Sequence, residues 1–266
     1  MKETKNIRKT LSVLISVYND EEYIYGALSS IFNQDRPPDE IVIVDDCSTD
    51  NSLAEINKFI IFVKPFNLKI KLVKNPENQG LTKSLNIGLK HITSDYIARQ
   101  DADDISLPNR FSIFFEFLEH NNNLQFYSTP YLNYDTNGLV RRPRALRRMG
   151  FDKEMLNYHN PLCHGTLIIK SSILKEYLYN EKYTFSQDYE LYRRLISNGY
   201  LISYDYVFTY FDRDHEKRIS RKKSKEQTND FNRIQGQKIK IGSKLSSLIF
   251  LYLDILFLIK KIFKLK

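Results

Sequence analysis

The chain has 266 residues, enough for one large domain or for one domain with appendages, and its 42% apolar and 13% aromatic residues support a substantial core. A net charge of +8 fits three kinds of partner: nucleic acid, an anionic membrane surface or an anionic substrate. Only two cysteines occur, Cys47 and Cys163, in no metal-binding spacing; a reduced cytosolic chain is the simpler interpretation, although the two could form one disulfide.

The first ten residues are polar, and the apolar stretch that follows is too short and too interrupted for a signal peptide. We therefore expect a chain that is not exported. From residue 11 to about residue 128, β-rich apolar runs alternate with segments of helical spacing. Strands are predicted at Leu11–Val17, Glu40–Val44, Lys69–Val73 and Asp95–Ala98. Helices are predicted at Glu21–Phe32, at Ser52–Phe62 with Asp50 as its N-cap, and at Leu81–His91. This alternation predicts βαβ units and a mainly parallel sheet.

Residues 121–149 are less regular and include a basic run at 141–148. Beyond them we predict a strand at Thr166–Ile169, a helix at Asp188–Ser197 and a last strand at Val207–Tyr210. Residues 213–225 are strongly basic, which indicates a mobile or surface segment.

The end of the chain differs from everything before it. Residues 245–259 are nearly all apolar, apart from Asp254, and four lysines follow. Fifteen residues fall short of the roughly 20 that span a bilayer. The pattern favours an interfacial helix with a basic end, and the alternative is a helix packed on the core.

Three carboxylates, those of Asp101, Asp103 and Asp104, follow the short apolar run 96–98. So much negative charge needs water or a cation beside it, and carboxylate oxygens are hard ligands that suit Mg²⁺ or Mn²⁺. A divalent ion bound there could coordinate a diphosphate. The end of a strand is also where an open α/β sheet binds its ligands.

A second acidic group, in Val44–Asp50, ends the second predicted strand. An acidic pair at the carboxyl end of a strand can accept hydrogen bonds from a base or a ribose. Asp50 is better explained as the cap of the next helix, whereas the cap does not require Asp46.

Four segments in this order resemble the family 2 glycosyltransferases, which are inverting enzymes with the GT-A fold. The segments are Ile15–Asn19, Val44–Asp50, Asn78–Asn86 and Ala98–Asp104. Each motif alone is weak, but four in order at the expected spacing are specific, and the resemblance extends over about residues 11–220. Residues 80–86, together with the acidic motif and Arg110, resemble the bacterial branch that builds O-antigen and capsule repeat units.

The resemblance implies roles for residues near the donor. Ser16 and Tyr18 match nucleotide contacts, with the Tyr18 ring against the base, although Ser16 replaces the family's usual proline. Asp46 matches the acceptor of a hydrogen bond from uracil. Lys83 lies near the sugar-nucleotide cleft by position, but Leu85 occupies the place of an arginine common in this helix, which puts nucleotide contacts from the helix in doubt.

The same resemblance implies that Asp101 and Asp103 form an Asp-any-Asp motif. Asp103 is the expected direct ligand of Mn²⁺ or Mg²⁺, Asp101 faces the metal or the ribose, and Asp104 shapes the turn. Asp188, at the start of a helix, matches the base that deprotonates the acceptor hydroxyl; Glu190 lies on another face of that helix and cannot replace it. The structural alternative for Asp188 is a helix cap.

Three further residues match the border of the active site. His164 occupies a position beside the acceptor, with a purely structural histidine as the alternative. Arg213 and His215 resemble a mobile segment near the diphosphate, with a solvated basic loop as the alternative.

The implied reaction moves a hexose or N-acetylhexosamine from a UDP-sugar, with UDP-glucose or UDP-galactose favoured, to an undecaprenyl-diphosphate-linked saccharide, forming a β-linkage. The implied architecture is a GT-A domain at residues 1–220, with a donor half at about 11–128 and an acceptor half at about 129–220. Residues 221–266 form a basic linker and an amphipathic helix. We expect a cytoplasmic protein at the inner face of the plasma membrane that binds no nucleic acid.

Two other functions compete with this interpretation. A sugar-nucleotide pyrophosphorylase would carry a Gly-rich basic loop after the first strand, and residues 17–22 offer none. A basic nucleic-acid-binding protein would use residues 141–148 and the many tyrosines, but no recognisable nucleic-acid motif is present. An inactive sugar-nucleotide-binding relative is a third possibility, against which the retained Asp103 and Asp188 argue.

Overall fold

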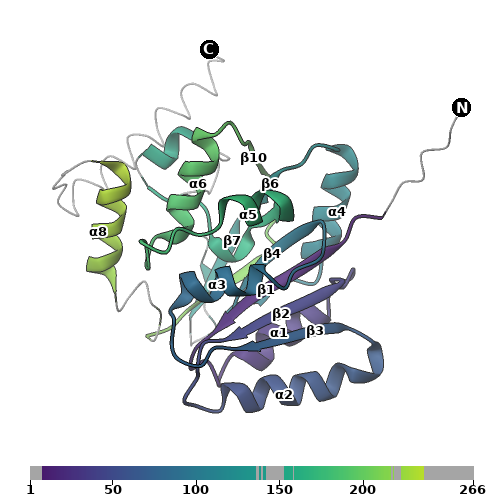
Figure 1. Cartoon of the computed structure of the whole chain (residues 1–266). Coiled ribbons are helices and arrows are strands. Elements are labelled where there is room, and N and C mark those ends of the chain that lie inside the picture. Colours follow the sequence, from purple (N-terminus) through teal and green to yellow (C-terminus); the bar gives the residue numbers. More distant parts are fainter. Residues whose placement is uncertain are drawn as a thin grey trace, which may run out of the picture.

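The fold is built around a seven-stranded sheet with the strand order β10-β6-β9-β4-β1-β2-β3 (Figure 1). The structure, a computed structural model, describes residues 8–135, 138, 140–141, 153–157, 159–216, 218 and 223–236. The first four strands run parallel: β1 (Leu11–Val17), β2 (Glu40–Asp45), β3 (Lys69–Lys74) and β4 (Tyr96–Asp101).

Helices cover both faces of this parallel sheet. On one face, α1 (Ile24–Phe32), α2 (Ser52–Val63) and α4 (Arg110–His120) share a core with alternate residues of β1 and β2. On the other face, α3 (Leu81–Leu89), α5 (Ser171–Tyr177) and α6 (Gln187–Ser197) bury the remaining strand residues. Burial on both faces explains why β1 and β2 read as continuous apolar runs. The predicted α/β architecture is therefore confirmed.

The predicted elements differ from the structure mainly at their ends. α1 begins at Ile24 instead of Glu21, because residues 20–23 form a turn in which Tyr23 N donates to Asp20 O at 2.9 Å. Strand β4 continues to Asp101, so the acidic motif starts within the sheet. Asp50 lies one residue before the assigned cap of α2, yet its Oδ1 accepts the amide hydrogen of Ser52 at 2.9 Å.

An antiparallel strand links the two halves of the sheet. β9 (Ile168–Lys170) lies between β4 and β6 (Phe126–Ser128) and runs antiparallel to both, while β10 (Ile202–Tyr204) pairs with β6 in parallel. The short helix η3 (His164–Thr166) comes just before β9. Because β9 runs backwards along β4, η3 lies next to the carboxyl end of β4, where the acidic motif is.

A second, four-stranded sheet has the order β5-β11-β7-β8. Its strands are β5 (Ile105–Ser106), β7 (Tyr131–Asp135), β8 (Val140–Arg141) and β11 (Tyr210–Asp214). The last strand predicted at Val207–Tyr210 was placed too early, since β11 starts at Tyr210, and Val207 is 42% exposed. The start of β11 is set by strand pairing, because Tyr210 lies opposite Ser106 of β5 on one side and Tyr131 of β7 on the other.

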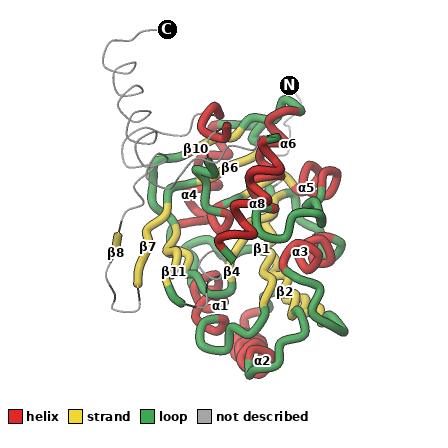
Figure 2. The backbone as a smooth tube through the Cα atoms, turned by 90° about the vertical axis from the view of Figure 1, so that its left-hand side faces the viewer, coloured by secondary structure: helices red, strands yellow, loops and turns green. Residues whose placement is uncertain are grey.

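Three further elements complete the described chain: η1 (Lys64–Phe66), η2 (Lys153–Asn157) and α8 (Ser224–Gln235). Residues 224–235 belong to the segment expected as a basic linker, and they form α8, which lies beside α6 (Figure 2). The Phe231 ring of α8 stacks on the Tyr189 ring of α6 with centroids 4.7 Å apart. This part of the linker is thus packed on the domain.

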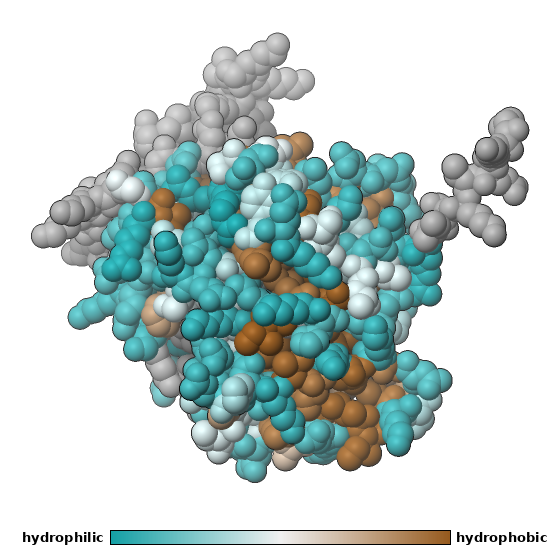
Figure 3. Space-filling view, viewed as in Figure 1, coloured by the Kyte–Doolittle hydropathy of each residue, from teal (hydrophilic) through white to brown (hydrophobic). Residues whose placement is uncertain are grey.

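An apolar surface lies at the far end of α2. Figure 3 shows apolar side chains gathered at its lower right, and the large exposed ones at the end of α2 and in η1 are Ile61, Phe62 and Phe66. The start of α2 is at the carboxyl edge of the sheet, where the Ser52 hydroxyl accepts a hydrogen bond from Asp20 N. Twelve helical residues span about 18 Å, so the apolar surface is well separated from that edge.

Within the described part of the chain, no helix combines the length and the apolar character needed to cross a membrane. The apolar segment predicted at 245–259, and the basic residues after it, lie outside the described residues. Both cysteines, Cys47 and Cys163, are free thiols.

Candidate active site

Two loops at the carboxyl edge of the sheet are joined by hydrogen bonds. Asn19, after β1, and Cys47, after β2, both adopt left-handed backbone conformations, with φ of 57° and 61°. The Asn19 side chain accepts the amide hydrogen of Thr49 at 2.8 Å. Tyr18 is 46% exposed beside these contacts, and Ser16 lies opposite both Val44 and Asp101 in the sheet. The predicted nucleotide contacts therefore share one edge with the acidic motif.

The Asp46 carboxylate, predicted to contact a base, is buried and hydrogen-bonded within the protein. Asp46 is 2% exposed, and its carboxylate accepts hydrogen bonds from Asn75 Nδ2, Gln79 N and Gly80 N at 2.7–2.8 Å. Gly80 has a φ of 82°, a conformation that favours glycine. Asp46 thus fastens the loop that leads into α3. Its contact with a base stays a prediction, and that contact must share the carboxylate with this loop.

The end of β4 is braced from inside by Gln100 and Arg110, both almost fully buried. The Gln100 amide donates to the carbonyls of Asp101 and Asp104 at 3.1 Å, and its oxygen accepts from Arg110 Nη1 at 3.0 Å. Arg110 Nη2 also donates to Gly165 O at 2.7 Å. A side chain at Gly165 would collide with the Tyr210 hydroxyl at 2.2 Å. Arg110 therefore ties the acidic turn to the segment that carries His164.

Replacing Arg110 with Met is expected to destabilise the fold by about 3 kcal/mol or more, because several buried carbonyl and amide oxygens lose their donor. The control is Arg8→Met, which removes a surface pair with Asp39 at a side chain 68% exposed and should cost less than about 1 kcal/mol. Urea unfolding followed by circular dichroism measures both. Equal stability of the two variants would contradict a bracing role for Arg110.

Asp101 contacts Arg99, a buried cation behind the acidic turn. Its Oδ1 accepts from Arg99 Nη2 at 2.5 Å, and Arg99 is 1% exposed. Burial acts to raise the pKa of Asp101, but the Arg99 guanidinium, helped by other arginines, outweighs it and holds the pKa below its usual value. Asp101 is therefore a carboxylate at neutral pH.

Arg213 of β11 and His215, which lies just after that strand, contact Asp103 and Asp104. His215 Nε2 lies 2.7 Å from Asp103 Oδ2, and Arg213 Nε donates to Asp103 O at 2.8 Å. Arg213 N donates to Asp104 Oδ1 at 2.7 Å. Asp104 is 2% exposed, and burial together with the charge of Asp103 raises its pKa well above the ordinary value. Asp104 thus secures the turn to β11, while the Asp103 side chain stays 23% exposed.

Two aromatic rings hold Arg213 in place. Its guanidinium carbon lies 4.7 Å from the Tyr23 ring centroid and 4.6 Å from that of Tyr134. Asp20 lies in the same region, where burial, with a further contribution from Asp103, raises its pKa to about 7. The Arg213–His215 segment is therefore packed against the acidic turn in this structure.

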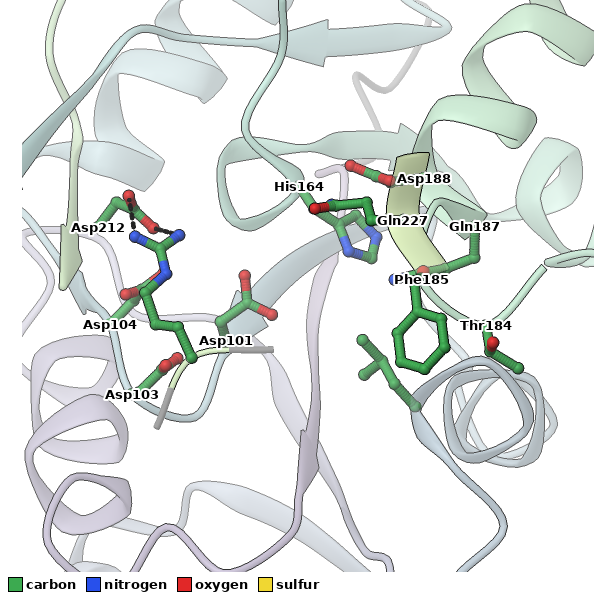
Figure 4. A pocket seen from close by; sticks show the side chains of 12 residues that line it. Asp101, Asp103, Asp104, His164, Thr184, Phe185, Gln187, Asp188, Asp212 and Gln227 are labelled. Atoms are coloured by element: carbon green, nitrogen blue, oxygen red, sulfur yellow. Dashed lines mark hydrogen bonds and ion pairs between the residues drawn. The ribbon is translucent and has the colours of Figure 1, made fainter. Parts of the chain in front are cut away.

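A pocket of about 190 Å³ opens between the two halves (Figure 4). The carboxylates of Asp101, Asp103, Asp104 and Asp212 lie on one side, and Arg218 binds Asp212 there through two hydrogen bonds of 2.7 and 2.9 Å. The other lining residues are Leu81, His164, Thr184, Phe185, Gln187, Asp188 and Gln227. Residues more than 100 positions apart in sequence thus face one cavity.

Asp188 has the properties of a base that works near neutral pH. Burial raises its pKa to about 6, against the opposing effect of hydrogen bonds from Tyr189 N and Asn160. Asn160 Nδ2 donates to Asp188 Oδ2 at 2.7 Å, which orients the carboxylate. A carboxylate with this pKa is mostly ionised at pH 7 and can accept a proton readily.

His164 faces the same pocket in its neutral form. Burial, together with the charge of Arg99, lowers its pKa to about 3. Its Nε2 lies 2.8 Å from the Tyr179 hydroxyl, which fixes the ring. His164 can therefore offer a hydrogen bond to a ligand without adding charge to the site.

The pocket unites four of the predicted site residues: Asp101, Asp103, His164 and Asp188. Lys83 is exposed on α3 and is not among the lining residues. Sequence reasoning assigned no role to several pocket-lining residues from later elements, namely Phe185, Gln187, Asp212, Arg218 and Gln227. It also assigned no role to the two buried residues at the end of β4, Arg99 and Gln100. Arg99 and Gln100 lie inside the acidic motif at residues 98–104, so their position could have indicated a role in the site. No local sequence pattern indicates a role for Gln227.

The donor set at the acidic turn fits a divalent ion that is shared with a substrate. Among the described residues, no three His, Cys, Asp or Glu side chains are arranged to hold a metal by themselves. Mg²⁺ commonly keeps several waters and takes one or two carboxylates together with substrate phosphates. Asp103 and Asp101, which are 23% and 29% exposed at the pocket, could supply such ligands.

Comparison with solved structures identifies the fold as GT-A. The mannosyltransferase PcManGT from Pyrobaculum calidifontis, in complex with GDP-Man and Mn²⁺, superposes with a TM-score of 0.69 and 21% identity, covering 90% of this chain and 66% of that one. TarS from S. aureus, in complex with UDP-GlcNAc, gives a TM-score of 0.68 at 20% identity, covering 91% of this chain and 70% of TarS. The predicted GT-A fold is confirmed.

Sequence comparisons agree with this. EpsE of Bacillus subtilis, named as a glycosyltransferase, is 33% identical over 193 residues, 71% of this chain and 68% of EpsE. WfaP of Escherichia coli, a UDP-Glc:alpha-D-GlcNAc-diphosphoundecaprenol beta-1,3-glucosyltransferase, is 29% identical over 243 residues, 90% of this chain and 91% of WfaP. The family model described as glycosyl transferase family 2 matches residues 12–178. The chain therefore belongs to glycosyl transferase family 2, as its four ordered motifs predict.

Proposed function

We propose that this enzyme transfers a hexose or N-acetylhexosamine, with inversion, from a UDP-sugar to a saccharide carried on undecaprenyl diphosphate. The observation that carries the proposal is the pocket that joins Asp101 and Asp103 to Asp188, whose pKa burial raises to about 6. One side suits a diphosphate with a divalent ion, and the other presents a base. The relative WfaP, which acts on a diphosphoundecaprenol-linked sugar, supports the acceptor class.

A UDP-sugar is the favoured donor. WfaP is named for UDP-Glc, another relative from Escherichia coli is named for UDP-Gal, and TarS was solved with UDP-GlcNAc. PcManGT, with GDP-Man, shows that the fold also accepts another base. UDP-glucose or UDP-galactose is the first choice for an assay.

In the proposed mechanism, Asp188 receives the proton of the acceptor hydroxyl as that oxygen forms a bond to the anomeric carbon. The bond from this carbon to the diphosphate oxygen breaks, and the nucleoside diphosphate leaves with the electron pair. Single displacement inverts the anomeric centre, so an α-linked donor gives a β-linkage. When bound, a Mn²⁺ or Mg²⁺ ion supplies positive charge that offsets the charge developing on the leaving group.

The chain's own side chains prepare this step. Asp103 and Asp101 would hold the ion, and Arg213 positions Asp103 through its carbonyl. Neutral His164 can donate a hydrogen bond near the reacting sugar. Arg99, buried behind Asp101, keeps that carboxylate ionised and oriented.

A panel of UDP-sugars, each with Mn²⁺ or Mg²⁺ and a synthetic GlcNAc-α-diphospho-lipid, tests the proposal. Product detection by mass spectrometry and assignment of the new linkage by NMR should give one β-linked disaccharide. Retention of the donor's α-configuration, or no transfer from any nucleotide sugar, would reject the proposed reaction.

The basic, apolar end of the chain supports a place at the cytoplasmic face of the plasma membrane, where a lipid-linked acceptor is found. Deleting residues 245–266 is expected to move the enzyme from the membrane fraction to the soluble fraction, because the only predicted interfacial segment is lost. Fractionation after cell lysis measures this. Unchanged membrane association of the truncated chain would rule out the predicted anchor.

A further inference from the structure

The side of the pocket that faces the acidic turn presents Asp188, and the uncharged residues around Asp188, called here the neutral side, have no role yet in the proposed function. The neutral side contains Thr184, Phe185 and Gln187, and Gln227 of α8 reaches in between the two sides (Figure 4). Uncharged groups of this kind do not attract a diphosphate. They suit a neutral ligand that has both apolar surface and hydroxyl groups.

Phe185 is an aromatic residue that the core does not use. It is half-buried, lines the pocket and belongs to neither hydrophobic cluster of the described residues. Its backbone is fixed, because Phe185 N donates to Asp230 Oδ2 at 3.3 Å. The ring therefore offers apolar surface to whatever enters this side of the pocket.

Two amide side chains lie beside that ring. Gln187 is only 6% exposed and Gln227 is half-buried, and both line the pocket. Neither amide is among the fully buried polar groups that lack a partner in the described chain, so both are open to the pocket. Each amide carries a donor and an acceptor, the combination that a sugar hydroxyl, itself both donor and acceptor, satisfies.

α8 is docked so that Gln227 points into the pocket while its main chain supports the wall. Ser186 Oγ donates to Gln227 O at 3.2 Å, Phe231 stacks on Tyr189, and Gln235 Nε2 donates to the Tyr189 hydroxyl at 2.9 Å. These contacts do not involve the Gln227 side chain. The amide of Gln227 is therefore available to a ligand in a fixed position.

We propose that Phe185, Gln187 and Gln227 form the subsite that binds the acceptor's terminal sugar. The ring packs against the apolar face of the pyranose, and the two amides bind its hydroxyls. Because Gln187 immediately precedes Asp188, a sugar held here presents a hydroxyl to the base. This inference rests on the proposed function and adds to it the residues that select the acceptor.

Kinetics of Phe185→Ala and Gln227→Ala test the subsite, with UDP-glucose or UDP-galactose as donor and the synthetic GlcNAc-α-diphospho-lipid as acceptor. Each variant should raise the acceptor KM about tenfold, the loss expected for one good contact. The donor KM, and the rate of donor hydrolysis without acceptor, should stay within about twofold because the charged side is untouched. Phe185→Tyr, which keeps the ring, should stay near wild type.

The matched controls are Phe66→Ala, 61% exposed in η1, and Gln125→Ala, which lies outside the pocket lining. Both should leave the acceptor and donor KM values unchanged. An unchanged acceptor KM in the two test variants, or a donor KM that rises equally, overturns the subsite while the proposed function stands. A wild-type enzyme that transfers no sugar overturns the proposed function, and the subsite with it. Melting temperatures confirm that the test variants are folded.

Discussion

Replacing Asp188 with Asn is expected to lower the rate of sugar transfer by at least about a hundredfold, the contribution of a well-placed general base. The amide has nearly the same shape, and its oxygen can still accept the hydrogen bond from Asn160, so the pocket should be preserved. Initial rates at saturating donor and acceptor measure the loss. Calorimetric binding of UDP should be unchanged, which separates the chemical step from folding.

The wild-type pH profile gives a second measurement on the same residue. Burial raises the pKa of Asp188 to about 6, and only the deprotonated form can accept the acceptor's proton. Transfer should therefore decline as the pH falls through about 6, by roughly tenfold per unit below it.

The matched control for Asp188→Asn is Glu190→Gln, since Glu190 pairs with Arg194 at 2.8 Å and does not line the pocket. Substantial transfer by Asp188→Asn would show that another group is the base.

The second large effect is expected at Asp103. Asp103→Asn should reduce metal-stimulated transfer by about a hundredfold or more, because a neutral amide is a much weaker ligand for Mn²⁺ or Mg²⁺ than a carboxylate. The measurement is the transfer rate against metal concentration, together with UDP binding with and without the ion. Asp35→Asn, at an exposed position, is the control. If Asp103→Asn responds to metal like the wild type, Asp103 is not a ligand.

Much of the donor half could be predicted from sequence because its signals are local. Parallel strands buried on both faces read as apolar runs, and loops at their carboxyl ends follow directly in the chain. The edge shared by Ser16, Asp46 and Asp101 follows from the strand pattern alone. The hydrogen bonds of Asp46 to the loop at residues 75–80 could not be predicted, since they depend on the turn at Gly80.

The acceptor half was harder to predict because its signals are not local. The start of β11 is set by pairing with Ser106 and Tyr131, which lie far away in sequence. Lys83 is exposed on α3 and does not line the pocket, so its contact with the sugar nucleotide stays a prediction. Gln227 comes from a segment whose composition indicated only a basic surface, and docking of Phe231 on Tyr189 brings it to the pocket.

Because α8 packs against α6, part of the pocket is formed by residues that follow the family match. The family match ends at residue 178, whereas the proposed base and both amides of the proposed subsite come from residues 187–227. This later stretch also supplies Asp212 and Arg218 to the charged side of the pocket. On the roles proposed above, a chimaera joined after residue 178 should take its acceptor preference from its C-terminal parent, while its charged side combines residues of both parents.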